Sequence, residues 1–126
     1  MITEDYVSFE TSKLLKGKGF DESTLQRYGA DGDMSSDGRM GKYNSLTKLN
    51  FIAAPTIQMA MKWLREEKDV QIEIAIVGTD TWESPTKWMY GFRCQTKDVI
   101  DRRNADFSSY EQACEAAIKY CLENLI

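Results

Sequence analysis

The strongest constraint on the fold is an alternating apolar pattern in the second half of the chain. Every second residue from Val70 to Ile76 is apolar and β-branched, and every second residue from Trp88 to Cys94 is aromatic or a cysteine. An alternation with a period of two places these side chains on one face of an extended strand. A loop over residues 78–85 separates the two runs. The sequence therefore predicts an antiparallel hairpin with one buried face.

Two helices are predicted before this hairpin. Ser8 can cap a short helix that runs through Lys16 and stops at a following glycine, with Thr3 as a competing start. Pro55 suits the first position of a helix over 55–67, because its missing N–H group would have no partner there. Apolar residues recur at helical spacing along this second segment. A helix is therefore expected directly before the hairpin.

A third helix is predicted at the end of the chain. Ser109 and Gln112 form the pattern of a capping box, in which each side chain satisfies a free backbone amide. Small and apolar residues follow at helical spacing as far as Leu125, so this helix can approach a sheet closely. Earlier in the chain, residues 24–28 and 48–52 have weak strand character.

Residues 29–41 lie between the two weak strands and are rich in glycine, serine and aspartate, which predicts a flexible loop or the tip of a hairpin. The predicted order is helix, two weak strands, helix, hairpin and helix. This order favours a single α+β domain that spans residues 1–126. Its small, mainly antiparallel sheet is expected to be covered on one face by the helices.

Composition narrows the class of protein. The chain has no histidine, which excludes catalytic sites of the Ser-His-Asp, Cys-His and HExxH types. The longest apolar runs are far shorter than the roughly 20 residues that cross a bilayer. The first residues are acidic, where a secretory signal is basic. Cys94, Cys114 and Cys121 lie in apolar contexts that suit buried thiols in a reducing compartment. We therefore expect a cytoplasmic protein without membrane contact.

No motif for catalysis, cofactor binding or metal binding stands in the sequence. Oxygen-bearing residues alternate from Asp31 to Asp37 as in a calcium loop, but Ser36 and Lys42 occupy the positions where an EF-hand requires glycine and glutamate. The glycines after Lys16 follow a predicted helix instead of preceding one, so they do not form a phosphate-binding loop. We expect no enzymatic activity, no cofactor and no metal ion.

Two candidate interaction surfaces remain. Trp82 with Glu83 is the first, because a tryptophan in an exposed loop is typical of interaction sites; packing of Trp82 over the sheet edge is the alternative. The second candidate is a basic patch, for which scattered solvated charges are the alternative. This patch requires five cationic residues to converge: Lys13, Lys16, Lys18, Arg102 and Arg103.

Three stretches of the chain resemble a known group of proteins. They are ITEDYVSFE (residues 2–10), APTIQMAMKWLRE (residues 54–66) and SYEQACEAAIKYCLENLI (residues 109–126). All three are similar to sequence segments in short uncharacterised proteins of gut Bacteroides-type bacteria and of their phages and mobile elements. The group has no assigned activity, so the resemblance implies no site residue. It implies a small intracellular accessory protein of phage or mobile-element origin.

These features favour a noncatalytic interaction or accessory module that binds a protein partner through the Trp82 loop and the hairpin. An exposed strand edge also allows a homodimer. The alternative is a nucleic-acid-binding accessory protein that uses the basic patch and a stacking aromatic ring. The net charge of −4 opposes nonspecific attraction to phosphate, so nucleic acid is not the expected partner.

Overall fold

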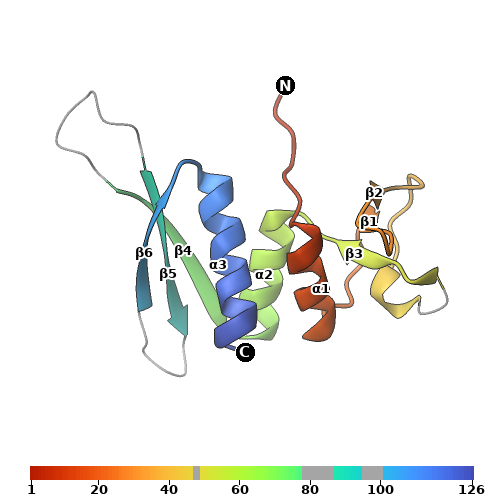
Figure 1. Cartoon of the computed structure of the whole chain (residues 1–126). Helices are drawn as coiled ribbons and strands as arrows, with labels where there is room; N and C mark the ends of the chain where they lie inside the picture. Colours follow the sequence, from red (N-terminus) through yellow and green to blue (C-terminus); the bar gives the residue numbers. More distant parts are fainter. Residues whose placement is uncertain (47–48, 78–86, 95–100) are drawn as a thin grey trace.

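The computed structural model describes residues 1–46, 49–77, 87–94 and 101–126, with residues 101–106 described by their backbone alone. The described residues form helices and two small antiparallel sheets, which confirms the α+β class (Figure 1). The elements in chain order are α1 (Phe9–Gly17), β1 (Gln26–Tyr28), β2 (Met34–Ser35), the short 3₁₀ helix η1 (Tyr43–Ser45), β3 (Ile52–Ala54), α2 (Ile57–Glu67), β4 (Val70–Val77), β5 (Lys87–Cys94), β6 (Asp101–Phe107) and α3 (Tyr110–Asn124).

The sheet of the C-terminal half has the strand order β4-β5-β6 and is antiparallel throughout. β4 and β5 pair along their whole length, from Val70 opposite Cys94 to Val77 opposite Lys87, which confirms the predicted hairpin. The sequence does not predict β6. Most residues of β6 are polar and show no alternation, so its pairing with β5 depends on tertiary structure and leaves no periodic signal.

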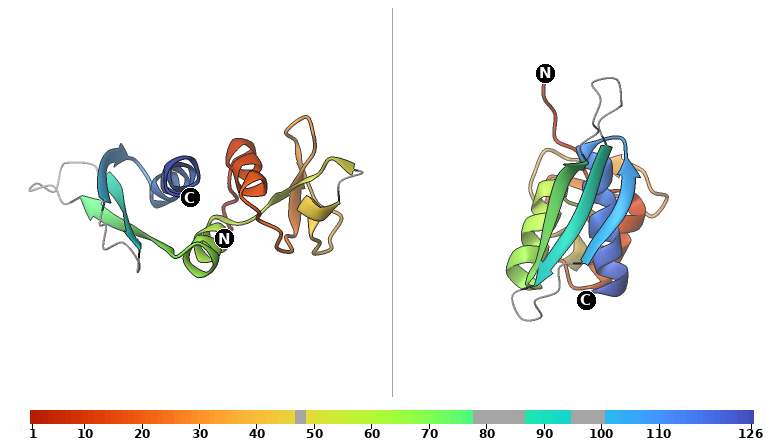
Figure 2. Two further views of the ribbon diagram at one scale, coloured as in Figure 1. Left: turned by 90° about the horizontal axis from the view of Figure 1, so that it is seen from below. Right: turned by 90° about the vertical axis from the view of Figure 1, so that its left-hand side faces the viewer.

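Helices α2 and α3 cover the same face of this sheet (Figure 2). α2 begins later than predicted, because Thr56 and not Pro55 stands at its start: the Thr56 hydroxyl accepts a hydrogen bond from the Met59 amide at 3.1 Å. The Pro55 carbonyl pairs instead with the extended N-terminal segment. None of the helices formed by the described residues combines the length and apolar character needed to cross a membrane.

The other two helices begin at the predicted capping residues. The Ser8 hydroxyl accepts from the Thr11 amide at 3.2 Å, and the Ser109 hydroxyl accepts from the Gln112 amide at 3.1 Å. The reciprocal half of the capping box forms one residue earlier than predicted, because the Gln112 side chain accepts from Ser108. Local hydrogen-bonding chemistry therefore defines where α1 and α3 start.

A second sheet, β2-β1-β3, lies beside α1 at the other end of the molecule, whereas the sequence predicts only one sheet (Figure 1). β1 falls inside the predicted strand 24–28, but β3 begins at Ile52, where the other weak strand was expected to end. β2 lies inside segment 29–41 and pairs with β1 across a tight turn. Strands of two or three residues are too short to show a readable alternation.

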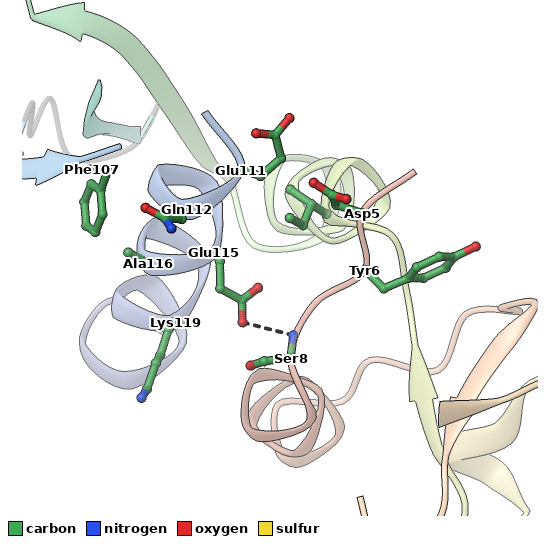
Figure 3. A pocket seen from close by; sticks show the side chains of 10 residues that line it. Asp5, Tyr6, Ser8, Phe107, Glu111, Gln112, Glu115, Ala116 and Lys119 are labelled. Atoms are coloured by element: carbon green, nitrogen blue, oxygen red, sulfur yellow. Dashed lines mark hydrogen bonds between the residues drawn. The ribbon is translucent and has the colours of Figure 1, made fainter. Parts of the chain in front are cut away.

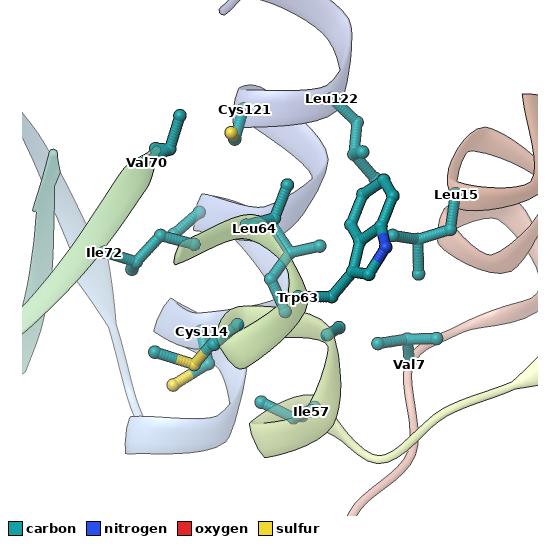
Figure 4. Packing of buried hydrophobic residues seen from close by; sticks show 14 of the residues in the cluster. Val7, Leu15, Ile57, Trp63, Leu64, Val70, Ile72, Cys114, Cys121 and Leu122 are labelled. Atoms are coloured by element: carbon teal, nitrogen blue, oxygen red, sulfur yellow. The ribbon is translucent and has the colours of Figure 1, made fainter. Parts of the chain in front are cut away.

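Trp63 connects the two halves through one continuous core. Its side chain is 7 % exposed and meets the ring of Phe20 edge-on, with ring centroids 5.4 Å apart. Figure 4 shows the indole of Trp63 between Leu15 of α1 and Leu122 of α3. The buried cluster continues from there to the aromatic face of β5. α1 and α3 are thus held side by side, which sets up the surface between them.

Candidate functional site

An open groove of about 570 Å³ crosses the exposed face of α3. Figure 3 shows that it extends from the N-terminal segment on one side of α3 to Phe107, at the end of β6, on the other side. Its surface is mainly apolar. We call it the α3 groove, and these residues line it: Asp5, Tyr6, Ser8, Ile57, Phe107, Glu111, Gln112, Glu115, Ala116 and Lys119.

The N-terminal segment forms one wall because it is hydrogen-bonded to the start of α2. The Val7 amide donates to the Pro55 carbonyl at 3.1 Å, and the Ile57 amide donates to the Asp5 carbonyl at 2.9 Å. These bonds use only backbone atoms of the segment, so they leave the Asp5 side chain exposed to solvent. Asp5 is therefore fixed at the edge of the groove.

Glu115 joins α3 to the start of α1. Its Oε1 accepts from the Ser8 amide at 3.0 Å and from the buried Thr11 hydroxyl at 2.7 Å. Its Oε2 is buried without a hydrogen-bond partner, and no cation of the described residues forms an ion pair with it. Burial, together with the charge of Glu115, raises the pKa of Tyr28. The carboxylate thus holds the wall in place.

Carboxylates outnumber cations among the described residues that line the α3 groove. Glu111 and Asp5 are exposed, and within the described part of the chain neither has an ion-pair partner. Among the described residues of the lining, Lys119 is the one cation, and its ammonium group bonds to Glu10 at 3.1 Å. The hydrogen bond and charge of Glu10 raise the pKa of Lys119. Lys119 is therefore engaged mainly with Glu10, while Asp5 and Glu111 have no ion-pair partner among the described residues.

The lining offers groups for binding, and its described residues include no thiol. Cys114 and Cys121 lie on the buried side of α3, where burial raises the pKa of their thiols to about 11 and about 12. Thiols with such pKa values are protonated near neutral pH and are poor nucleophiles. The described residues also contain no group of three or more metal-ligating side chains placed to hold an ion.

Two smaller hollows are less suited to a partner. One, of about 440 Å³, borders Trp63, Glu66 and Glu67, and the other, of about 370 Å³, borders Asp69 and Arg93. Both have a larger polar share of surface than the α3 groove. Desolvating polar surface costs free energy unless the partner satisfies each group. The α3 groove is therefore the candidate functional site.

The backbone places the predicted basic residues on separate surfaces. Lys13 and Lys16 belong to α1, whereas Arg102 and Arg103 belong to β6, which lies on the opposite side of α3 (Figure 2). The ammonium groups of Lys16 and Lys18 donate to backbone carbonyls at 3.3 and 2.7 Å. The other predicted surface, Trp82 with Glu83, lies outside the described residues and stays a prediction.

Sequence reasoning used α3 only for its cap and its buried stripe, and it missed the groove. The available signal was a second stripe, Glu111, Glu115, Lys119 and Glu123, which recurs every fourth residue on the exposed face. Nothing in the sequence indicates that the N-terminal segment lies beside this stripe. No protein-family model, no curated protein and no solved structure matches the chain, so its candidate function rests on the geometry of the α3 groove.

Proposed function

We propose that this chain is a noncatalytic protein-interaction module that holds a segment of a partner protein in the α3 groove. The observation that carries this proposal is an open, mainly apolar surface bordered by the exposed carboxylates of Asp5 and Glu111, which have no ion-pair partner in the described part of the chain. Exposed apolar surface with a polar border is typical of interaction sites. A volume of about 570 Å³ accommodates a few side chains of a partner.

The fixed walls support recognition by a groove that exists before the partner arrives. Backbone bonds hold the N-terminal segment against α2, and Glu115 holds α3 against the start of α1. A surface that is already ordered loses less conformational entropy when a partner binds. The acidic border also disfavours phosphate, so nucleic acid remains the less favoured partner. A cytoplasmic location and a mobile-element origin remain predictions from the sequence.

A photo-crosslinking amino acid at Gln112 tests this proposal in cells of the native source. Gln112 is exposed and lines the α3 groove, whereas Glu67 is exposed and borders a different hollow. We expect the Gln112 variant to capture a discrete protein and the matched Glu67 variant to capture none. Equal capture from both positions, or none from Gln112, contradicts a specific site at the groove.

The predicted Trp82 surface has its own test. Trp82→Ala should abolish recovery of the partner in a pull-down and leave the melting temperature almost unchanged, if the tryptophan contacts the partner and has no packing role. The groove variants described below provide the comparison. An unchanged pull-down removes Trp82 from the interaction surface and leaves the α3 groove as the site.

A further inference from the structure

We propose that the segment bound in the α3 groove carries a lysine or arginine next to an aliphatic or aromatic residue. This inference rests on the proposed function and names the chemistry of the partner. It depends on two properties of the same groove, which are the exposed carboxylates at its border and its apolar lining.

The charge of the groove selects a cation. Asp5 and Glu111 are exposed at its border, and Glu115 adds a carboxylate with two donors on Oε1 and none on Oε2. Lys119, the lysine that the described part of the lining contains, is bonded to Glu10. A cation that enters therefore meets the two exposed carboxylates of Asp5 and Glu111, which have no ion-pair partner among the described residues, and opposite charge also steers its approach.

The apolar lining selects a long side chain over a small cation. Ile57 comes from α2, Ala116 from α3, and Phe107 from the end of β6, so apolar surface spans the groove. Lysine and arginine carry an apolar stem below a charged head. The stem can cover this surface while the head reaches the carboxylates. A neighbouring aliphatic or aromatic side chain extends the same contact along the groove.

The overall charge argues against the opposite class of partner. The chain carries a formal charge of −4, and an acidic segment would bring further carboxylates to Asp5, Glu111 and Glu115. Like charges brought together at an interface suppress binding. A basic, partly apolar segment is therefore the occupant that the described surface fits.

Nuclear magnetic resonance with short capped peptides tests the inference. The probes are acetyl-Leu-Arg-Phe-amide and acetyl-Leu-Lys-Phe-amide, and their matched controls carry glutamine or glutamate at the centre. Titration to millimolar concentration into the isotope-labelled chain should shift the backbone amides of Ser8, Gln112 and Ala116 with the cationic peptides. The glutamine peptide should bind at least about fivefold more weakly, which is the effect of roughly one exposed ion pair.

The double variant Asp5→Asn and Glu111→Gln supplies the charge test on the protein side. Neither side chain makes a hydrogen bond within the described structure, so the fold should be kept. We expect it to weaken the cationic peptides about fivefold and to leave the glutamine peptide unchanged. Glu22→Gln with Glu67→Gln removes the same charge beside another hollow and should have little effect.

The negative results distinguish a wrong partner chemistry from a wrong interaction site. If crosslinking at Gln112 captures a partner while the arginine and glutamine peptides bind equally, the cationic partner is wrong and an interaction site at the groove stands. If both double variants weaken the binding of the cationic peptides equally, the inference is also refuted, since peptide binding then depends on the overall charge of the protein. If the cationic peptides leave the groove amides unshifted, the inference is wrong, whatever the crosslinking shows.

Discussion

Glu115→Ala should destabilise the protein by about 2–3 kcal/mol, because this carboxylate fastens α1 and the N-terminal segment to α3. It accepts from the Ser8 amide and the Thr11 hydroxyl at 3.0 and 2.7 Å. Hydrogen bonds to a charged group contribute about 1.5–3 kcal/mol each, so the two together are worth about 3–6 kcal/mol. Removing the buried, unpartnered Oε2 recovers about 1–3 kcal/mol, and the central values of about 4.5 and about 2 kcal/mol differ by about 2–3 kcal/mol.

Urea unfolding followed by circular dichroism measures this change through linear extrapolation. Glu123→Ala is the matched control, because Glu123 is an exposed glutamate on the same helix. Its carboxylate lies 4.0 Å from the ammonium group of Lys119. It should cost less than about 0.5 kcal/mol beyond helix propensity. Glu115→Gln keeps one acceptor oxygen and should fall between the two. If Glu115→Ala costs no more than Glu123→Ala, Glu115 does not hold the groove wall.

Three further predictions concern the core and its thiols. Trp63→Ala should cost about 3–5 kcal/mol in the same unfolding assay, because it leaves a cavity between the two halves; a loss below about 1 kcal/mol would contradict a shared core. Alkylation followed by mass spectrometry should label the half-buried Cys94 before Cys114 and Cys121, whose raised pKa values keep them protonated; equal rates would refute their burial. Burial raises the pKa values of these two thiols to about 11 and about 12, above the ordinary value of 9.0. The free energy of unfolding that depends on their protonation is therefore complete below pH 9.0, and it is lost as the pH rises through the two raised pKa values. The variant Cys114→Ala with Cys121→Ala should lose less stability than the parent over that range, and equal losses would contradict the raised pKa values.

Local sequence patterns predicted the strands β4 and β5 and the helices α1 and α3. The alternation in β4 and β5 fixed their pairing, since it leaves one face of each strand to be buried. Ser8 and Ser109 predicted the starts of α1 and α3 because the capping side chain and the amide it satisfies lie within three residues. β6 and the second sheet could not be predicted in this way, since their strands are polar or too short to show a period.

The sequence by itself determined the α+β class, the hairpin, the helices and the buried thiols of α3, because each depends on spacing within a few residues. Only the tertiary structure decided that Asp5 lies across from Glu111, and that Glu115 bonds to Ser8, more than a hundred positions away along the chain. The physical reason is that the groove is formed by the surfaces of separate elements. The shared core around Trp63 determines how these elements lie beside one another. The pattern of apolar residues within one segment does not show where that segment lies relative to another.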